Sequence, residues 1–209
     1  MNQEKSFLYY ASKVLSYFLH PFVIPVYGIL ILFYSGIMFS YAELPSQSRV
    51  FWVVLLNITA IPAAAVILMR IFGVIKDFSL STRHDRMVPL FIVAICYGLA
   101  AWVISDVPGV YILRRFMVAG MGCTIFAFVV NMFWQVSLHM TAMGGIVGAL
   151  AVLLLAGYVK LLPVFCVVLL LAGALGSARL YLGKHNLSQV AVGFFGGLTV
   201  SAAIILFVG

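Results

Sequence analysis

Long apolar segments separated by short polar connections make up most of this chain. Seven of them can be placed, at about residues 18–41, 51–75, 87–105, 116–134, 139–158, 163–182 and 188–208. Roughly twenty consecutive apolar residues cross the hydrocarbon core of a bilayer as a helix. Ten-residue stretches of alternating hydrophobicity, which are typical of a transmembrane β-barrel, are absent from the sequence. The segments therefore predict an all-α, polytopic transmembrane helical bundle of six to seven spans, in a single membrane domain over residues 1–209.

Composition and charge narrow the location and the partners. The chain is 65% hydrophobic and only 8% charged, whereas a soluble domain carries about a quarter charged residues. The formal net charge of +7 sits in short loops beside the spans, where anionic lipid or an anionic substrate is favoured over nucleic acid. The first twenty residues lack the pattern of a cleaved signal peptide, so we expect them to be retained. We expect an integral protein of a bacterial inner membrane, surrounded by the lipid bilayer.

Glycine and alanine recur inside the predicted spans. They form the stretches GMG at 120–122, GGIVGA at 144–149 and GFFGG at 193–197. Small residues allow helix backbones to approach closely in lipid, so these stretches predict close helix packing. The fifth segment begins almost where the fourth ends, which predicts a tight turn near 135–137.

The polar connections sort onto two membrane faces by the number of crossings between them. Seven crossings place the N-terminus and the connections 76–86, 135–138 and 183–187 on one face. The Lys and Arg residues on this face are themselves candidates for chemistry, so the positive-inside rule gives no orientation. Three polar clusters that are far apart in the sequence are thus expected on the same side of the membrane.

The first cluster, KDFSLSTRHDRMVP at 76–89, carries the cations Lys76, Arg83 and Arg86. A solvated belt of charge at the end of a span is one interpretation of these residues. A set of ligands for an anionic substrate is the other.

The second cluster is WQVSLHMT at 134–141. Ser137 is a plausible N-cap for the fifth span, which places His139 in the first helical turn. Free backbone N–H groups and the helix dipole favour an anion at that position. A hydrogen-bonded structural histidine is an equally open interpretation of His139.

The third cluster is GSARLYLGKHNLSQVAVGFFGG at 176–197. Arg179 lies near the end of the sixth span, where burial without a partner is costly, and the nearby sequence offers no carboxylate. His185 and Gln189 are four residues apart, so they share a helix face if the helix has begun. Gln189 can then hydrogen-bond one ring nitrogen of His185 and leave the other nitrogen to react.

Together the clusters suit a phosphate ester. Lys76, Arg83 and Arg179 would neutralise a dianionic phosphate, with arginine binding its oxygens in bidentate fashion. One histidine could attack phosphorus while the other protonates the departing alcohol. The sequence has no carboxylate or cysteine cluster of the metal-binding kind, so we expect chemistry without a metal or other cofactor.

These residues resemble three motifs of the type 2 phosphatidic acid phosphatase (PAP2) superfamily, which run K-x6-R-P, P-S-G-H and S-R-x5-H-x3-D. The matching stretches are Lys76-x6-Arg83-His84, Val136-Ser137-Leu138-His139 and Ala178-Arg179-x5-His185-x3-Gln189. The resemblance covers residues 76–197, which would form a PAP2-like catalytic core. The chain departs from the motifs at His84, Val136, Leu138, Ala178 and Gln189, and the last of these replaces an aspartate that orients the nucleophilic histidine.

The resemblance implies a role for each site residue. His185 would be the nucleophile that forms a phosphohistidine, and His139 would be the general acid for the leaving alcohol. The phosphate-binding residues would be Lys76, Arg83, Arg179, Ser137 and the backbone amide of Leu138. The substrates of the family include phosphatidic acid, phosphatidylglycerol phosphate, polyprenyl diphosphates and lipid A phosphates.

Three functions remain open at this point. The first is a lipid phosphatase that works with Gln189 in place of the aspartate. The second is a PAP2-like protein that binds or transports a phospholipid or polyprenyl phosphate without hydrolysing it. The third is a membrane cytochrome in which His139 and His185 bind haem, which a Soret band would reveal.

Overall fold

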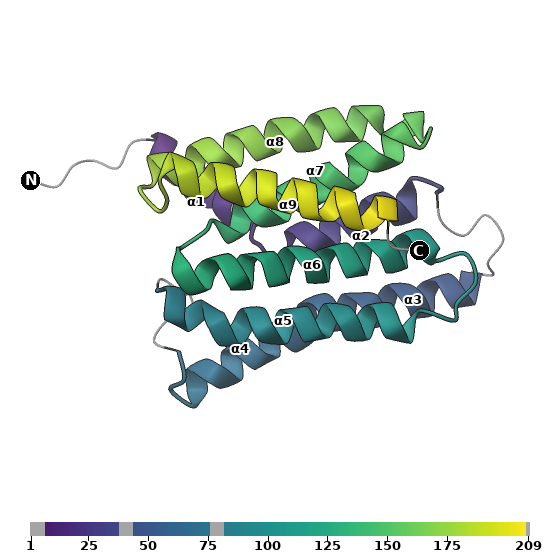
Figure 1. The fold of residues 1–209 in the computed structure, drawn as a ribbon, viewed down its shortest axis with the longest axis horizontal. Coiled ribbons are helices and arrows are strands. Elements are labelled where there is room, and N and C mark those ends of the chain that lie inside the picture. The colour runs from purple at the N-terminus through teal and green to yellow at the C-terminus, as the bar shows by residue number, and fades with distance from the viewer. Residues whose placement is uncertain (1–6, 38–43, 76–81, 208–209) are drawn as a thin grey trace, which may run out of the picture.

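The computed structural model describes residues 7–37, 44–75 and 82–207, and the regular structure in these ranges is entirely helical. The helices of the N-terminal part are α1 (Phe7–Phe18), α2 (Ile24–Tyr34), α3 (Leu44–Leu55), the π-helical turn η1 (Leu56–Ala60) and α4 (Ile61–Ile71). Those of the remainder are α5 (Arg83–Val103), α6 (Tyr111–Phe133), α7 (Leu138–Leu155), the 3-10 turn η2 (Val159–Leu161), α8 (Leu162–Tyr181) and α9 (Leu187–Phe207). The long helices run up and down along one common direction (Figure 1).

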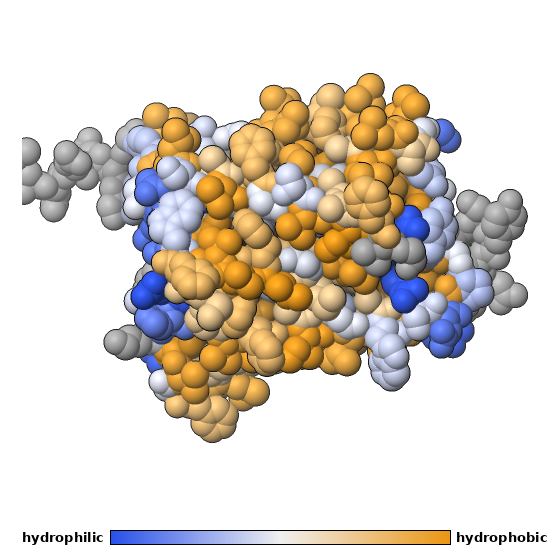
Figure 2. Space-filling model, viewed as in Figure 1, coloured by the Kyte–Doolittle hydropathy of each residue, from blue (hydrophilic) through white to orange (hydrophobic). Residues whose placement is uncertain are grey.

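Six helices in the described part of the chain are long and apolar enough to cross a membrane. They span Ser48–Ile71, Arg83–Val103, Tyr111–Phe133, Leu138–Leu155, Val159–Tyr181 and Leu187–Phe207. Figure 2 shows hydrophobic side chains over the middle of the molecule and hydrophilic ones gathered at its two ends, as a bilayer requires. The protein is therefore an integral membrane protein with an all-helical transmembrane fold, and six of the seven predicted spans are confirmed.

The first predicted span, 18–41, is wrong as one continuous helix. The chain leaves helical geometry between α1 and α2, around Pro21. Proline disfavours helical backbone in the residue before it and removes a backbone donor. Helix α2 has 11 residues, or about 16 Å, which is roughly half the thickness of the hydrocarbon core.

The second predicted span is present but contains a local irregularity. The π-helical turn η1 precedes Pro62, which lies in the first turn of α4. Proline has no N–H to donate to the preceding turn, and a π-helical turn is a common way to absorb such a break. The span from Ser48 to Ile71 therefore continues through the proline.

Helices α7 and α9 pack backbone against backbone. A Cβ atom built at Gly144 or Gly148 would overlap the carbonyl oxygen of Phe194 or Leu198, and one at Gly197 would overlap that of Thr141. These glycines belong to two of the small-residue stretches, so close packing there is confirmed. The contact also fixes the relative positions of two predicted site residues, because α7 begins next to His139 and α9 begins next to His185.

The polar connections lie at one end of the bundle, as the crossing pattern predicts. The tight turn 134–137 joins α6 to α7, residues 182–186 join α8 to α9, and α5 begins at Arg83. Figure 1 shows these three positions at the same end, together with the N-terminal helix α1. The opposite end holds the α5–α6 and α7–α8 connections and the C-terminus.

Candidate functional site

A cavity of about 170 Å³ opens at this end of the bundle. Its walls come mainly from α5, α6 and α7. Single residues from α2, η1, α8, α9 and the α8–α9 connection complete them, and the connection between α1 and α2 closes one side. Two arginines and three histidines line it, namely Arg86, Arg179, His20, His139 and His185. Among the described residues that line the cavity there is no carboxylate. The cavity therefore favours an anion.

Gln189 holds His185 and caps α9 at the same time. Asn186 precedes the helix, and its Oδ1 accepts a hydrogen bond from the Gln189 N–H at 2.9 Å. In return the Asn186 N–H donates to Gln189 Oε1 at 3.2 Å, which completes a reciprocal capping box. Gln189 Oε1 also lies 3.0 Å from Nδ1 of His185. The contact expected from the four-residue spacing is thus present.

This network assigns the tautomer of His185. The Gln189 atom that accepts from Asn186 must be the amide oxygen, and an oxygen can only accept from the ring nitrogen it faces. Nδ1 of His185 therefore carries the hydrogen, and Nε2 of the neutral ring carries the lone pair. Burial lowers the pKa of His185 to about 4, the bond to Gln189 opposes this shift, and the charge of Arg179 adds to it. His185 is thus neutral at pH 7, with Nε2 available as a nucleophile or acceptor.

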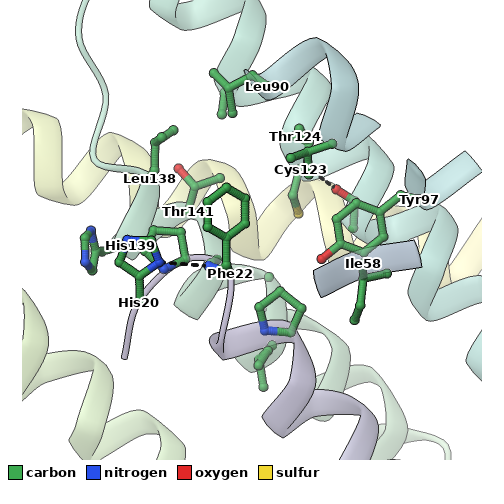
Figure 3. Close-up of a pocket in the computed structure, with 18 of the residues that line it drawn as sticks. His20, Phe22, Ile58, Leu90, Tyr97, Cys123, Thr124, Leu138, His139 and Thr141 are labelled. Atoms are coloured by element: carbon green, nitrogen blue, oxygen red, sulfur yellow. Dashed lines mark hydrogen bonds between the residues drawn. The ribbon is translucent and has the colours of Figure 1, made fainter. Parts of the chain in front are cut away.

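His139 lies in the first turn of α7 and contacts the N-terminal helix. Its Nε2 lies 3.2 Å from the carbonyl oxygen of Ser16 in α1. Because a carbonyl oxygen only accepts, Nε2 carries the hydrogen, and Nδ1 is the nitrogen that can exchange a proton. The ring of His139 meets the ring of His20 edge to face, with centroids 5.7 Å apart (Figure 3).

Two arginines supply the positive charge of the cavity. Arg86 is 8% exposed and donates from Nη1 to the carbonyl oxygen of Val136 at 3.2 Å. Arg179 comes from the last turn of α8, and its buried Nε has no hydrogen-bond partner among the described residues. A buried donor without a partner costs roughly 1–3 kcal/mol, and more when it is charged. A bound anion would satisfy the Arg179 guanidinium.

The other predicted phosphate ligands lie in different surroundings. Arg83 is exposed, and its Nη1 faces the carbonyl oxygens of Met132 and Phe133 at the end of α6. Leu138 lines the cavity. Ser137 occupies the N-cap position of α7, but its hydroxyl makes no capping bond, and it is buried outside the cavity lining. Lys76 lies outside the described residues.

Sequence reasoning did not assign two of the cavity residues to the site. Arg86 follows Arg83 by three residues, and it shares a helix face with Leu90 and Val93, which also line the cavity. That i, i+4, i+7 pattern was the available signal. His20 lies within the segment 18–41, which the sequence predicts to be one continuous span, so the sequence alone does not place it beside Pro21 in a helix break.

His20 has a defined orientation. Its Nδ1 accepts the backbone N–H of Phe22 at 3.4 Å, so Nε2 of the neutral ring carries the hydrogen. Burial and, to a smaller extent, the charge of Arg179 lower the pKa of His20. The N-terminal segment thus adds a neutral N–H donor to the lining of the cavity.

Comparison of the chain with protein-family models, with curated proteins and with solved structures finds no match. The chemistry of the site therefore rests on its own geometry. That geometry brings together two arginines, a histidine with a free Nε2, and a second histidine that can exchange a proton.

Proposed function

We propose that this protein is a membrane phosphatase of a bacterial inner membrane. It hydrolyses a lipid or polyprenyl phosphomonoester or diphosphate through a phosphohistidine intermediate, without a metal. The proposal extends the resemblance of residues 76–197 to a PAP2-like core. The observation that carries it is the buried Nε of Arg179, which has no hydrogen-bond partner among the described residues, in one cavity with His139 and His185.

Each cavity residue has a role in this reaction. Arg179 and Arg86 hold the phosphate oxygens, and the N–H of His20 donates a further hydrogen bond. The phosphomonoester binds as its monoanion, and the proton on its phosphate passes to Nδ1 of His139. Nε2 of His185 then attacks phosphorus, the P–O bond to the alcohol breaks, and His139 gives that proton to the departing oxygen. Water then attacks the phosphohistidine, and His139 takes the proton of that water. Gln189 keeps His185 in the reactive tautomer throughout.

The phosphate ligands differ in one respect from those that the motifs imply. Arg86 is buried in the cavity wall, whereas Arg83 contacts the end of α6. A buried cation interacts with a bound anion more strongly than a solvated one does, because the local dielectric is lower. Arg86 therefore replaces Arg83 as the phosphate ligand from α5.

The test measures phosphate release from a panel of lipid phosphates by the purified protein in detergent. We expect release from at least one substrate, and His185→Ala should reduce it to background. With radiolabelled substrate, the wild-type protein should trap an acid-labile phosphoenzyme that His185→Ala does not form. Absence of release from every substrate, with lipid phosphate still bound, would overturn the enzymatic proposal.

Arg86 and Arg83 form a matched pair for the same assay. Arg86→Gln should lower kcat/KM by about a hundredfold or more, as removal of a buried donor to a developing anion does. Arg83→Gln removes an exposed side chain and should change kcat/KM by less than about threefold. Equal losses in the two variants would contradict the placement of the phosphate beside Arg86.

A second function is favoured by one observation. Gln189 accepts the hydrogen bond of His185 but supplies no negative charge to stabilise a cationic ring. A protein that binds or transports a phospholipid or polyprenyl phosphate needs the arginines of the cavity but no reactive His185. Binding without phosphate release, unchanged in His185→Ala, would identify that function.

A further inference from the structure

We propose that the inner part of the cavity receives the apolar chain of the substrate, and that it accommodates one chain of about ten carbons. The preferred substrates are then phosphomonoesters with a single alkyl or isoprenoid chain, in preference to diacyl phospholipids. This inference rests on the proposed phosphate site at Arg86, Arg179 and His185.

Two helices, α5 and α6, measure the depth of the cavity. On α5 the lining runs from Arg86 to Tyr97, and on α6 it runs from Ala127 to Phe116. At 1.5 Å per residue, each face extends about 16 Å into the bundle. Ser201 of α9 also lines the cavity, far along the helix from its start at Leu187. The cavity thus reaches about half-way across the hydrocarbon core.

The lining changes in character along this depth. The polar groups of the site lie where α7 and α9 begin, whereas the α5 wall beyond Arg86 consists of Pro89, Leu90, Val93 and Tyr97. Figure 3 shows His20 and His139 on one side of the cavity and Tyr97 and Ile58 across from them, with Phe22 between. A ligand that follows this lining has a charged head and an apolar body.

The size of the cavity limits the ligand to a single apolar chain. A cavity needs a volume of roughly 10–15 Å³ to hold one water molecule, so a cavity of about 170 Å³ holds roughly a dozen. That space is comparable to a phosphate group and one chain of about ten carbons. It is far too small for two acyl chains of a phospholipid.

The walls also oppose a wider ligand. Gly120 lies against the ring of Tyr97, and a Cβ atom built there would overlap that ring. A Cβ atom at Gly145 would lie 3.2 Å from the sulfur of Cys123. Protein interiors packed this closely do not widen without cost. The inner part of the cavity between α5, α6 and α7, which we call the bore, therefore admits only a slender chain.

The test measures the binding of n-alkyl phosphonates with 2 to 16 carbons, which cannot be hydrolysed, at free concentrations corrected for uptake by detergent. Affinity should rise with each methylene, by up to about fourfold, and should stop rising near ten carbons. A diacyl phosphonate should bind no better than the ethyl compound. Affinity independent of chain length, or a continued rise to 16 carbons, would overturn the inference.

Two variants change the length of the bore in opposite directions. Ala119→Leu fills it from α6 and should lower the length at which affinity stops rising by about three carbons. Ile146→Ala enlarges it from α7 and should raise that length. Ile125→Phe adds as many atoms on an exposed face of α6 and should leave the length dependence unchanged. If all three variants retain the wild-type dependence, the chain does not enter the cavity.

The binding assay separates this inference from the proposed reaction. Chain-length dependence without hydrolysis of any ester would leave the chain site valid and overturn the phosphatase. Hydrolysis with no chain-length dependence, and no effect of Ala119→Leu, would leave the phosphatase valid and overturn the chain site. Inorganic phosphate should compete with every phosphonate equally, because it occupies only the head of the site.

Discussion

At the scale of single residues, Gln189 orients the proposed nucleophile, His185, with an amide in place of a carboxylate. Its Oε1 accepts two hydrogen bonds, one from the Asn186 N–H and one from the ring of His185. The same oxygen atom, Oε1, therefore helps to cap the start of α9 and also orients His185. A leucine of similar size would lose both contacts and leave the tautomer of His185 unspecified.

The expected pH dependence of the proposed reaction follows from the environment of His185. Its reactive form is neutral, and burial lowers its pKa to about 4. Protonation removes the lone pair of Nε2, so the rate should persist as the pH falls through 6.5 and should decline only near pH 4. A profile of kcat/KM between pH 3.5 and 8 measures this decline, which is the acidic limb of the curve. A decline centred near pH 6.5 would contradict the burial of a reactive His185.

Gln189→Glu adds a charge while keeping the length of the side chain. A carboxylate beside the ring favours the imidazolium form. An opposite charge at this distance raises the pKa of a histidine by about one to three pH units. The acidic limb of kcat/KM should therefore move to higher pH by at least about one unit. Asn186→Ala is the control, because it removes the capping bond to the Gln189 N–H without adding charge, so its limb should not move.

At the scale of the elements, the position of His185 relative to His139 depends on the contact between α7 and α9. Glycines bring the two backbones together along this contact, and the helix ends that carry the histidines follow from it. Because backbone atoms cannot move aside as a flexible side chain can, added bulk must separate the helices.

Gly148→Ala should therefore destabilise the protein by about 1–3 kcal/mol and reduce activity, because its Cβ would overlap the Leu198 carbonyl. The control is Gly173→Ala in α8, where a Cβ meets nothing within 4 Å. Alanine should stabilise α8 there by up to about 1 kcal/mol through its helix propensity. Thermal unfolding in detergent measures both. Equal destabilisation by the two variants would contradict the α7–α9 contact.

At the scale of the whole molecule, six spans place the α5 start, the α6–α7 turn and the α8–α9 turn on one membrane face. The N-terminal segment joins them there through two contacts, His139 with Ser16 and His139 with His20. The site thus combines residues from both ends of the chain.

Cysteine labelling in sealed vesicles tests this arrangement. In a cysteine-free background, His84→Cys and Lys184→Cys should react with an impermeant maleimide from the same side. Asp106→Cys and Lys160→Cys should react only from the opposite side or after permeabilisation. Labelling of His84→Cys and Lys184→Cys from different sides would contradict the six-span topology.

The apolar segments alone were sufficient to predict the helical class, six spans close to their final bounds and the common face of the three clusters. The length of each apolar segment and the parity of the crossings depend only on the local sequence, so tertiary packing does not change them. The spacing of His185 and Gln189 was likewise sufficient for their contact, because one helical turn joins them.

Tertiary packing was needed for the rest. Arg86, rather than Arg83, faces the cavity because the rotation of α5 is set by its neighbours, and the charge pattern of the segment is the same for either residue. His20 reaches the site because the break at Pro21 is completed by contacts with α7, over a hundred residues away. The depth and width of the cavity arise between helices, where side chains from distant segments meet, and no single segment encodes them.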